Sequence, residues 1–212
     1  MVNIAPRHVY VPSPQLIVAF TGLEGDVQSL SQELSRQVSS KLGRGLGFMK
    51  EQRQQRPVIS PRAMASLTSH ILYRRKQAPY YVEPLVVGLA EVNVADESIV
   101  ETSTTMTDAS QQKIPSTNAP GITYRPYLCS LDMIGAKSLS DAFVCAGAAS
   151  NSIFGTAEAL WEPGLTQERL VDVCANAFLG GLERDCLSGY GALLYLITKD
   201  GVTEYDLASR ND

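Results

Sequence analysis

The chain of 212 residues is poor in the residues that build metal sites or bind nucleic acid. It contains two histidines, His8 and His70, and four cysteines that never form a C-x-x-C pair, so no cluster of metal ligands is recognisable. Lys and Arg number 18 against 22 Asp and Glu, and this net charge of −4 argues against nucleic-acid binding, which needs a basic excess. Uninterrupted apolar runs are well short of the ~20 residues that cross a bilayer. We therefore expect no cofactor, no nucleic-acid partner and no membrane partner.

The composition is otherwise that of one globular domain. Apolar residues make up 44% of the chain and charged residues 19%, and the length allows a full hydrophobic core. The N-terminal sequence lacks the charged and apolar regions of a signal peptide. The four cysteines are therefore predicted to be reduced and mostly buried thiols; they are Cys129, Cys145, Cys174 and Cys186.

Hydrophobic spacing predicts the secondary structure along residues 1–212. Strands are predicted over residues 16–20, 84–94, 124–131 and 137–145, with a tight turn near 134–135 and a closing hairpin that turns at 199–201. Helices are predicted from Gly22 to the glycines at 43–47, from Pro61 through Leu72, over 150–160, and from Thr166 through Phe178. Paired helices on either side of a group of antiparallel strands do not suit an alternating βαβ sheet. The order therefore predicts an α+β fold.

Caps and inward faces can be predicted for three of the helices. Ser60 and Thr166 are expected N-caps, and Pro61 suits a first helical position. The expected inward residues of the second helix are Met64, Leu67, Thr68, Ile71 and Leu72; those of the third are Ile153, Phe154, Ala157, Leu160 and Trp161; those of the fourth are Leu170, Val173, Cys174, Ala177 and Phe178.

Residues 96–120 differ in composition from the rest of the chain. Nine of these 25 residues are Ser or Thr, and few large apolar side chains interrupt them. So polar a segment buries too little surface to offset the entropy of ordering it. We therefore predict a long exposed loop inserted between two strands.

Five motifs in this order are similar to the proteasome beta-subunit family, most closely to its eukaryotic type-3 branch. They are APYYVEP at 78–84, LVVGL at 85–89, YLCSLDMIG at 127–135, EALWEP at 158–163 and RDCLSG at 184–189. The resemblance implies the four-layer αββα sandwich of the N-terminal nucleophile hydrolases. It also implies a single beta-type domain over 1–212, and a location in the cytoplasm and nucleus.

Catalytic members of this family use an N-terminal threonine as nucleophile, together with a lysine, an aspartate, a helper serine and an oxyanion-side glycine. By the resemblance, His8 stands at the lysine position and Ala148 at the helper-serine position, while Gly22 matches the oxyanion-side glycine. The family's scaffold residues are matched by Asp185, Ser188 and Gly189. Because His8 has no nucleophile to serve, we interpret it as a structural or surface histidine.

Only seven residues precede His8, where the family resemblance implies about thirty. Either the natural protein has the family's N-terminal strand hairpin and this sequence omits it, or the natural chain lacks this hairpin. Loss of two central strands would expose sheet edges that favour aggregation, so we favour an incomplete N-terminus. A restored N-terminus would still leave a histidine at position 8 and an alanine at position 148.

Asp132 lies in the turn between two predicted strands and has two possible roles. It can be an ordinary turn aspartate. Alternatively, since neighbouring beta subunits complete each other's substrate pockets in this family, its charge can favour basic substrate side chains in a neighbour's pocket.

The sequence therefore predicts a non-catalytic structural subunit of the 20S proteasome beta ring. Its implied partners are other beta subunits in a seven-membered ring, the alpha-ring subunits and the opposite beta ring. Two alternatives stay open: an active threonine-type endopeptidase subunit with its N-terminus missing, and an independent N-terminal nucleophile hydrolase.

Overall fold

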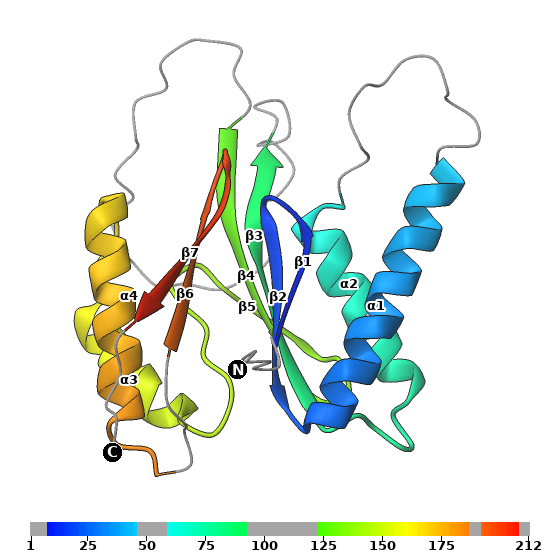
Figure 1. Ribbon diagram of the computed structural model, residues 1–212, viewed down its shortest axis with the longest axis horizontal. Helices are drawn as coiled ribbons and strands as arrows, with labels where there is room; N and C mark the ends of the chain where they lie inside the picture. The colour runs from blue at the N-terminus through cyan, green and yellow to red at the C-terminus, as the bar shows by residue number, and fades with distance from the viewer. Residues whose placement is uncertain (1–7, 46–58, 93–122, 187–191, 208–212) are drawn as a thin grey trace, which may run out of the picture.

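The computed structural model describes residues 8–45, 59–92, 123–186 and 192–207 (Figure 1). The predicted loop at 96–120 lies outside the described residues, as do Ser188 and Gly189. Two antiparallel sheets and two pairs of helices make up the described parts of the chain. The predicted α+β class is therefore confirmed.

The larger sheet has five strands that follow one another in chain order, each antiparallel to the next. The strands are β1 (Val9–Ser13), β2 (Leu16–Gly22), β3 (Val82–Val92), β4 (Thr123–Leu131) and β5 (Lys137–Ser140). Strand β5 ends well before the predicted limit at 145, because the chain leaves the sheet after Ser140.

Strand β1 was not predicted, because two prolines interrupt its sequence. Pro12 lies inside β1 and Pro14 follows it, and a proline cannot donate a hydrogen bond to a sheet ladder. The strand tolerates Pro12 because β1 lies at the edge of the sheet, where one side needs no partner. Its register with β2 is irregular between Tyr10 and Ser13, which is the stretch that holds the proline.

Helices α1 (Glu24–Gly45) and α2 (Pro61–Arg74) contact the larger sheet and enclose the main core with it. The hydroxyl of Ser60 accepts a hydrogen bond from the backbone amide of Ala63, so the predicted N-cap of α2 is confirmed. All five predicted inward residues of α2 are buried. Helix α1 ends at Gly45, among the glycines at 43–47 where its end was predicted.

Helices α3 (Ser150–Leu160) and α4 (Gln167–Leu182) pack closely on each other through small residues. A side chain added at Gly181 would overlap Ile153, and the hydroxyl of Thr156 donates to the carbonyl oxygen of Ala177 at 2.8 Å. Thr166 caps α4 as predicted, because its hydroxyl accepts a hydrogen bond from the amide of Arg169. The remaining strands, β6 (Ala192–Thr198) and β7 (Gly201–Leu207), form a hairpin that turns where predicted.

The predicted inward faces of α3 and α4 were partly wrong. Helix α3 has no buried residue, and Phe154 and Leu160 are 49% and 41% exposed. On α4, Val173 and Ala177 are buried but Leu170 and Cys174 are exposed. Hydrophobic spacing indicates an apolar face, but only α4 buries part of it, and large side chains on both helices remain uncovered.

The cysteines and Trp161 also depart from the predictions. All four thiols are free as predicted, but Cys129 alone is buried, while Cys174 and Cys186 are exposed. Trp161 was predicted to be a core residue, yet it is half-buried at the C-cap of α3.

The two helix pairs lie on opposite sides of the strands, with α1 and α2 on one side and α3 and α4 on the other (Figure 1). Strand β6 contacts β3, and α4 contacts β6, so the small sheet lies between the larger sheet and α4. Within the described ranges, no helix has the length and hydropathy needed to span a membrane.

Candidate functional site

The candidate site begins where β2 ends and α1 starts. Gly22 has a φ of +125°, a conformation that side chains rarely adopt, and a Cβ at this position would overlap the carbonyl oxygen of Tyr81. That carbonyl accepts a hydrogen bond from the amide of Leu23 at 2.9 Å. The close approach of β3 therefore requires glycine at position 22 and fixes the turn into α1.

The loop before α3 reaches the same end of β2. Gly147 has a φ of +98°, and a Cβ added there would lie 3.3 Å from the methyl group of Thr21. Ala148 follows directly and is exposed. The structure therefore brings the segments of Gly22 and Ala148 together. The assignment of Ala148 to the family's helper-serine position stays a prediction.

The hydroxyl of Thr21 lies at this junction but already has a structural partner. It donates a hydrogen bond to the carbonyl oxygen of Glu83, on the neighbouring strand β3, at 3.2 Å. Thr21 is also an internal residue of β2 with both of its peptide bonds formed. Its hydroxyl therefore links two strands and is not activated as a nucleophile, which would need an adjacent base.

His8 lies beside the same end of β2, since its carbonyl oxygen accepts a hydrogen bond from the amide of Phe20 at 2.8 Å. Its side-chain Nε2 lies 2.8 Å from Oε2 of Glu24, and Oε1 of Glu24 accepts a hydrogen bond from Gln28. Both partners are partly exposed, at 40% and 39% of their side-chain surfaces. The imidazole is thus bound to the first turn of α1, which agrees with its interpretation as a structural or surface histidine.

Glu24 is a site residue that the sequence reasoning missed. It begins α1, where a carboxylate is favoured by the partial positive charge of the helix N-terminus. This position explains Glu24 without any partner, so nothing in the sequence indicated a pair with His8. The pair joins the start of β1 to the start of α1.

Asp185 follows the end of α4. Its backbone amide donates to the carbonyl oxygen of Leu182 at 3.0 Å, and the residue is half-buried. Ser188 and Gly189, which the resemblance links with Asp185, lie outside the described residues. Their shared role as a scaffold stays a prediction.

The described thiols near these segments are poor nucleophiles. Burial raises the pKa of Cys145, which precedes the 146–150 loop, and the nearby Cys174 adds to the effect. Burial also raises the pKa of Cys129. A raised pKa keeps a thiol protonated at neutral pH, whereas the thiolate is the reactive form.

Asp132 organises the turn between β4 and β5. Its Oδ1 accepts hydrogen bonds from the amides of Ile134 at 3.0 Å and Ala136 at 2.7 Å. Its own amide donates to the carbonyl oxygen of Ala136, and its carbonyl oxygen accepts from Gly135. Asp132 therefore fills the turn role, and its exposed side chain keeps a second carboxylate oxygen, Oδ2, for other contacts.

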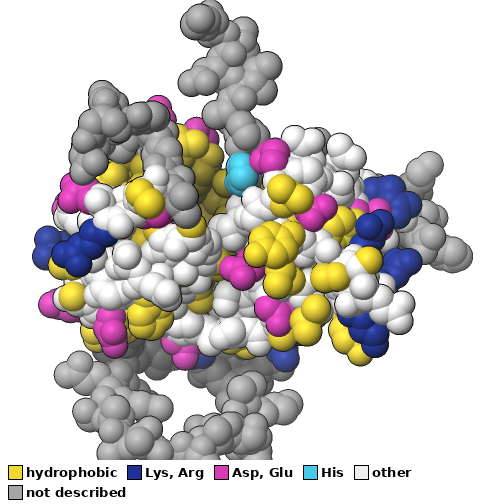
Figure 2. Space-filling view, turned by 90° about the horizontal axis from the view of Figure 1, so that it is seen from below, with side chains coloured by type: hydrophobic (Ala, Val, Ile, Leu, Met, Phe, Trp, Pro, Cys, Tyr) yellow, Lys and Arg dark blue, Asp and Glu magenta, His cyan; other side chains and the backbone are white. Residues whose placement is uncertain are grey.

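The surface at this end of the molecule carries many carboxylates. Figure 2 shows acidic side chains spread over the view from below, with Lys and Arg mainly at its two sides. Among the residues that the structure describes, no three His, Cys, Asp or Glu side chains come together as a metal site. The described carboxylates are therefore spread over the surface and do not form a group of metal ligands.

The structure is an α+β domain with antiparallel sheets and a glycine, Gly22, at the end of β2. Comparisons with known proteins identify its family. A family model described as proteasome subunit matches residues 119–197. The chain is 30% identical over 206 residues to a proteasome subunit beta type-3 from Picea mariana, covering 97% of this chain and 81% of that protein.

Two further relatives agree with the first. A proteasome subunit beta type-3-B from Arabidopsis thaliana is 31% identical over 197 residues, covering 93% of this chain and 76% of that protein. A proteasome subunit beta type-3 from Trypanosoma brucei brucei is 30% identical over 204 residues, covering 96% and 80%. The chain belongs to the proteasome subunit family, and the resemblance to its type-3 branch is confirmed.

Proposed function

We propose that this chain is a non-catalytic structural subunit in the beta ring of the 20S proteasome core particle, where it takes part in protein degradation. It binds two lateral beta neighbours in a seven-membered ring, the alpha ring and the opposite beta ring. Its work is to enclose the proteolytic chamber. The proposal places it in the cytoplasm and nucleus.

The proposal rests on the side chains near the end of β2, where His8, Gly22 and Ala148 lie. The position of the family's lysine holds His8, which is bound to Glu24 at 2.8 Å. The position of the helper serine holds Ala148, whose methyl group can neither donate nor accept a proton. A threonine nucleophile in this setting would lack both of the groups that tune and relay its proton.

The four-layer αββα sandwich is part of the proposal. The contacts of α1 and α2 with the larger sheet, of β6 with β3, and of α4 with β6 support it.

Asp132 is proposed to act in the pocket of a neighbouring catalytic subunit. Its Oδ1 is bound by two backbone amides, which fixes the carboxylate in one orientation. The exposed Oδ2 is then available to a cationic substrate side chain across a subunit boundary. The partner pocket lies outside this chain, so the proposal rests on the rigid turn and its charge.

Isolation of native particles through a tag on this chain tests the proposal. We expect the chain to appear in a particle with the mass of a 20S core, and an electrophile that traps N-terminal threonines to label other subunits but not this one. Label on this chain would favour the alternative of an active threonine-type endopeptidase. Recovery as a small oligomer with its own amidase activity would favour an independent N-terminal nucleophile hydrolase.

A further inference from the structure

The end of α2 carries a basic and aromatic surface that the proposed chamber role does not use. Three consecutive cations, Arg74, Arg75 and Lys76, lie at the C-terminal end of α2, and all three are exposed. Large exposed apolar side chains lie in the same region: Tyr73 is 57% exposed, Tyr81 66% and Leu23 60%. We call these six residues the α2-end patch.

Hydrogen bonds and ring contacts hold the patch in shape. Nζ of Lys76 lies 4.5 Å from the ring centre of Tyr73 and donates to its hydroxyl at 3.1 Å. The guanidinium of Arg75 lies 4.6 Å from the ring centre of Tyr80, which is a buried core residue. The charges of Lys76 and Arg75 are thus oriented by aromatic rings, an arrangement that loses little side-chain entropy when a partner binds.

The apolar part of the patch is equally fixed. The amide of Leu23 donates to the carbonyl oxygen of Tyr81 at 2.9 Å, which places the two residues side by side. The amide of Tyr81 donates to Oδ2 of Asp26 at 2.9 Å. One oxygen of that carboxylate therefore holds the backbone of Tyr81 in place, and the side chains of Leu23 and Tyr81 remain at the surface.

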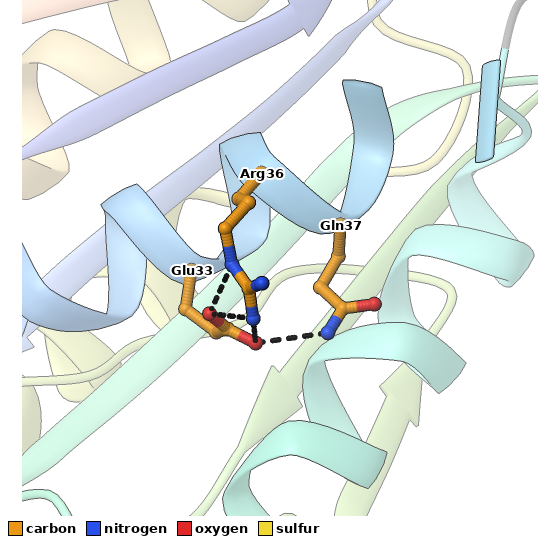
Figure 3. Close-up of polar contacts among 3 residues, drawn as sticks. All are labelled: Glu33, Arg36 and Gln37. Atoms are coloured by element: carbon orange, nitrogen blue, oxygen red, sulfur yellow. Dashed lines mark hydrogen bonds and ion pairs between the residues drawn. The ribbon is translucent and has the colours of Figure 1, made fainter. Parts of the chain in front are cut away.

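The three cations of the patch are not held in ion pairs by the described side chains. Within the described ranges, no carboxylate lies in ion-pair distance of Arg74, Arg75 or Lys76. Arg74 is close enough to help lower the pKa of Glu33, but the larger causes are hydrogen bonds from Gln37 and Arg36. Figure 3 shows both of these side chains bound to the Glu33 carboxylate, which is therefore already occupied.

One segment of the chain has a clear surplus of acidic residues. Residues 141–186 contain seven Asp or Glu and two Arg or Lys. They form α3, α4 and their connections, on the far side of the strands from α2 (Figure 1). This acidic surplus lies away from the α2-end patch and does not pair with its three cations.

We infer that the α2-end patch is an interaction surface for an acidic segment of another protein chain. Tyr and Arg are the side chains enriched at the centres of protein interfaces, and the three cations select a negatively charged partner. Helix-dipole stabilisation accounts for cations in the last turn of α2, but it gives no reason for Leu23 and Tyr81 to be exposed beside them. The inference rests on the proposed function, because the partner is sought within the assembled particle.

Photo-crosslinking in the assembled particle tests the inference. Tyr81 is replaced by p-benzoylphenylalanine, particles are purified through the tagged chain, and native mass first establishes that the chain is assembled. After irradiation, we expect the cross-linked peptide to come from another protein chain and to contain several Asp or Glu residues. Failure to assemble would count against the proposed function, whereas an assembled particle without such a cross-link would count against the patch.

Charge variants then identify what the cations contribute. The double change Arg74→Ala with Arg75→Ala should lower the cross-linking yield by about fivefold, and 0.5 M salt should do the same to the unchanged patch. The matched control is Arg62→Ala, an exposed arginine at the opposite end of the same helix, which should leave the yield unchanged. Cross-links to a non-acidic peptide, to RNA or to lipid, or a yield insensitive to both changes, would overturn the inference.

Discussion

The hydroxyl of Ser69 on α2 donates a 2.6 Å hydrogen bond to the carbonyl oxygen of Gly135 in the β4–β5 turn. A Cβ added to Gly135 would overlap the carbonyl oxygen of Ser69, so the turn lies directly on the helix. Nζ of Lys137 also donates to the hydroxyl of Ser66, one turn earlier on α2. The turn that carries Asp132 is therefore clamped to the core helix and is held as one unit with it.

Gly135→Ala should destabilise the chain by about 1–3 kcal/mol. The residue has a φ of +89°, and the added methyl group would have no space against the backbone of Ser69. Urea unfolding measures the loss, and incorporation into particles should fall with it. The matched control is Gly155→Ala on α3, where a Cβ would meet nothing within 4 Å and alanine favours the helix, so stability should be unchanged or higher. Equal stability of both variants would mean that the turn can move off α2.

The contrast between α2 and α3 explains how far the sequence could predict the fold. Helix α2 was predicted correctly from its start to its inward face, because Ser60 and Pro61 act locally and the helix packs on a broad sheet. Phe154 of α3 has the same apolar spacing but is 49% exposed. Spacing indicates which face of a helix is apolar, but the element that covers this face is decided by the whole chain or by a partner.

The candidate site likewise has residues that could be named from the sequence and residues that could not. Gly22 and Ala148 were named as site positions through the resemblance, and their closeness is seen only in the structure. The pair of His8 with Glu24 was not predicted, because the proline in β1 hid this edge strand from the sequence pattern. When a strand such as β1 is not predicted from the sequence, the contacts that it makes with other elements cannot be predicted either.

Tyr127→Phe should make the chain less sensitive to alkaline pH. Burial raises the pKa of Tyr127 to about 12, whereas an unfolded tyrosine titrates near 10. Between about pH 10 and 12 the unfolded chain therefore binds fewer protons than the folded chain, and stability falls as pH rises. Phenylalanine has no proton to lose, so the variant should lose less stability across this window, by on the order of 1 kcal/mol after allowance for partial exposure.

Urea unfolding at pH 7, 9 and 11 checks the Tyr127 prediction. The difference between wild type and Tyr127→Phe should be constant at the first two values and should shift in favour of the variant at the third. The same pH dependence in both proteins would mean that the phenol is as accessible in the folded chain as in the unfolded one.

His8→Gln and His8→Ala should separate a structural role from a catalytic one. Glutamine can still donate a hydrogen bond toward Glu24, whereas alanine cannot. Since both partners are partly exposed, we expect a loss of only about 0.2–1 kcal/mol for alanine and less for glutamine. Peptidase activities of the purified particle should be the same for both variants. A selective loss of one activity, with stability unchanged, would assign His8 a chemical role.

Asp132 gives the most direct test of how this chain influences a neighbour. Its Oδ1 accepts two backbone amides, and the amide oxygen of asparagine can accept the same two. Asp132→Asn therefore removes the charge and keeps the turn, whereas Asp132→Ala removes both. If Oδ2 reaches a cationic substrate side chain, Asp132→Asn should slow cleavage after Arg and Lys by about tenfold, since a charged hydrogen bond contributes about 1–3 kcal/mol.

Cleavage after Leu or Tyr should be nearly unchanged in Asp132→Asn particles, and the remaining cleavage after Arg should respond less to salt than that of the wild type, because a screened charge has been removed. Asp132→Ala should also reduce particle yield, since the amides of Ile134 and Ala136 lose their acceptor. Asp141→Asn, an exposed acidic residue just past β5, is the matched control and should change neither activity nor yield. Equal slowing of basic and apolar substrates by Asp132→Asn would mean that the carboxylate serves only the turn, because a structural change cannot distinguish substrate charge.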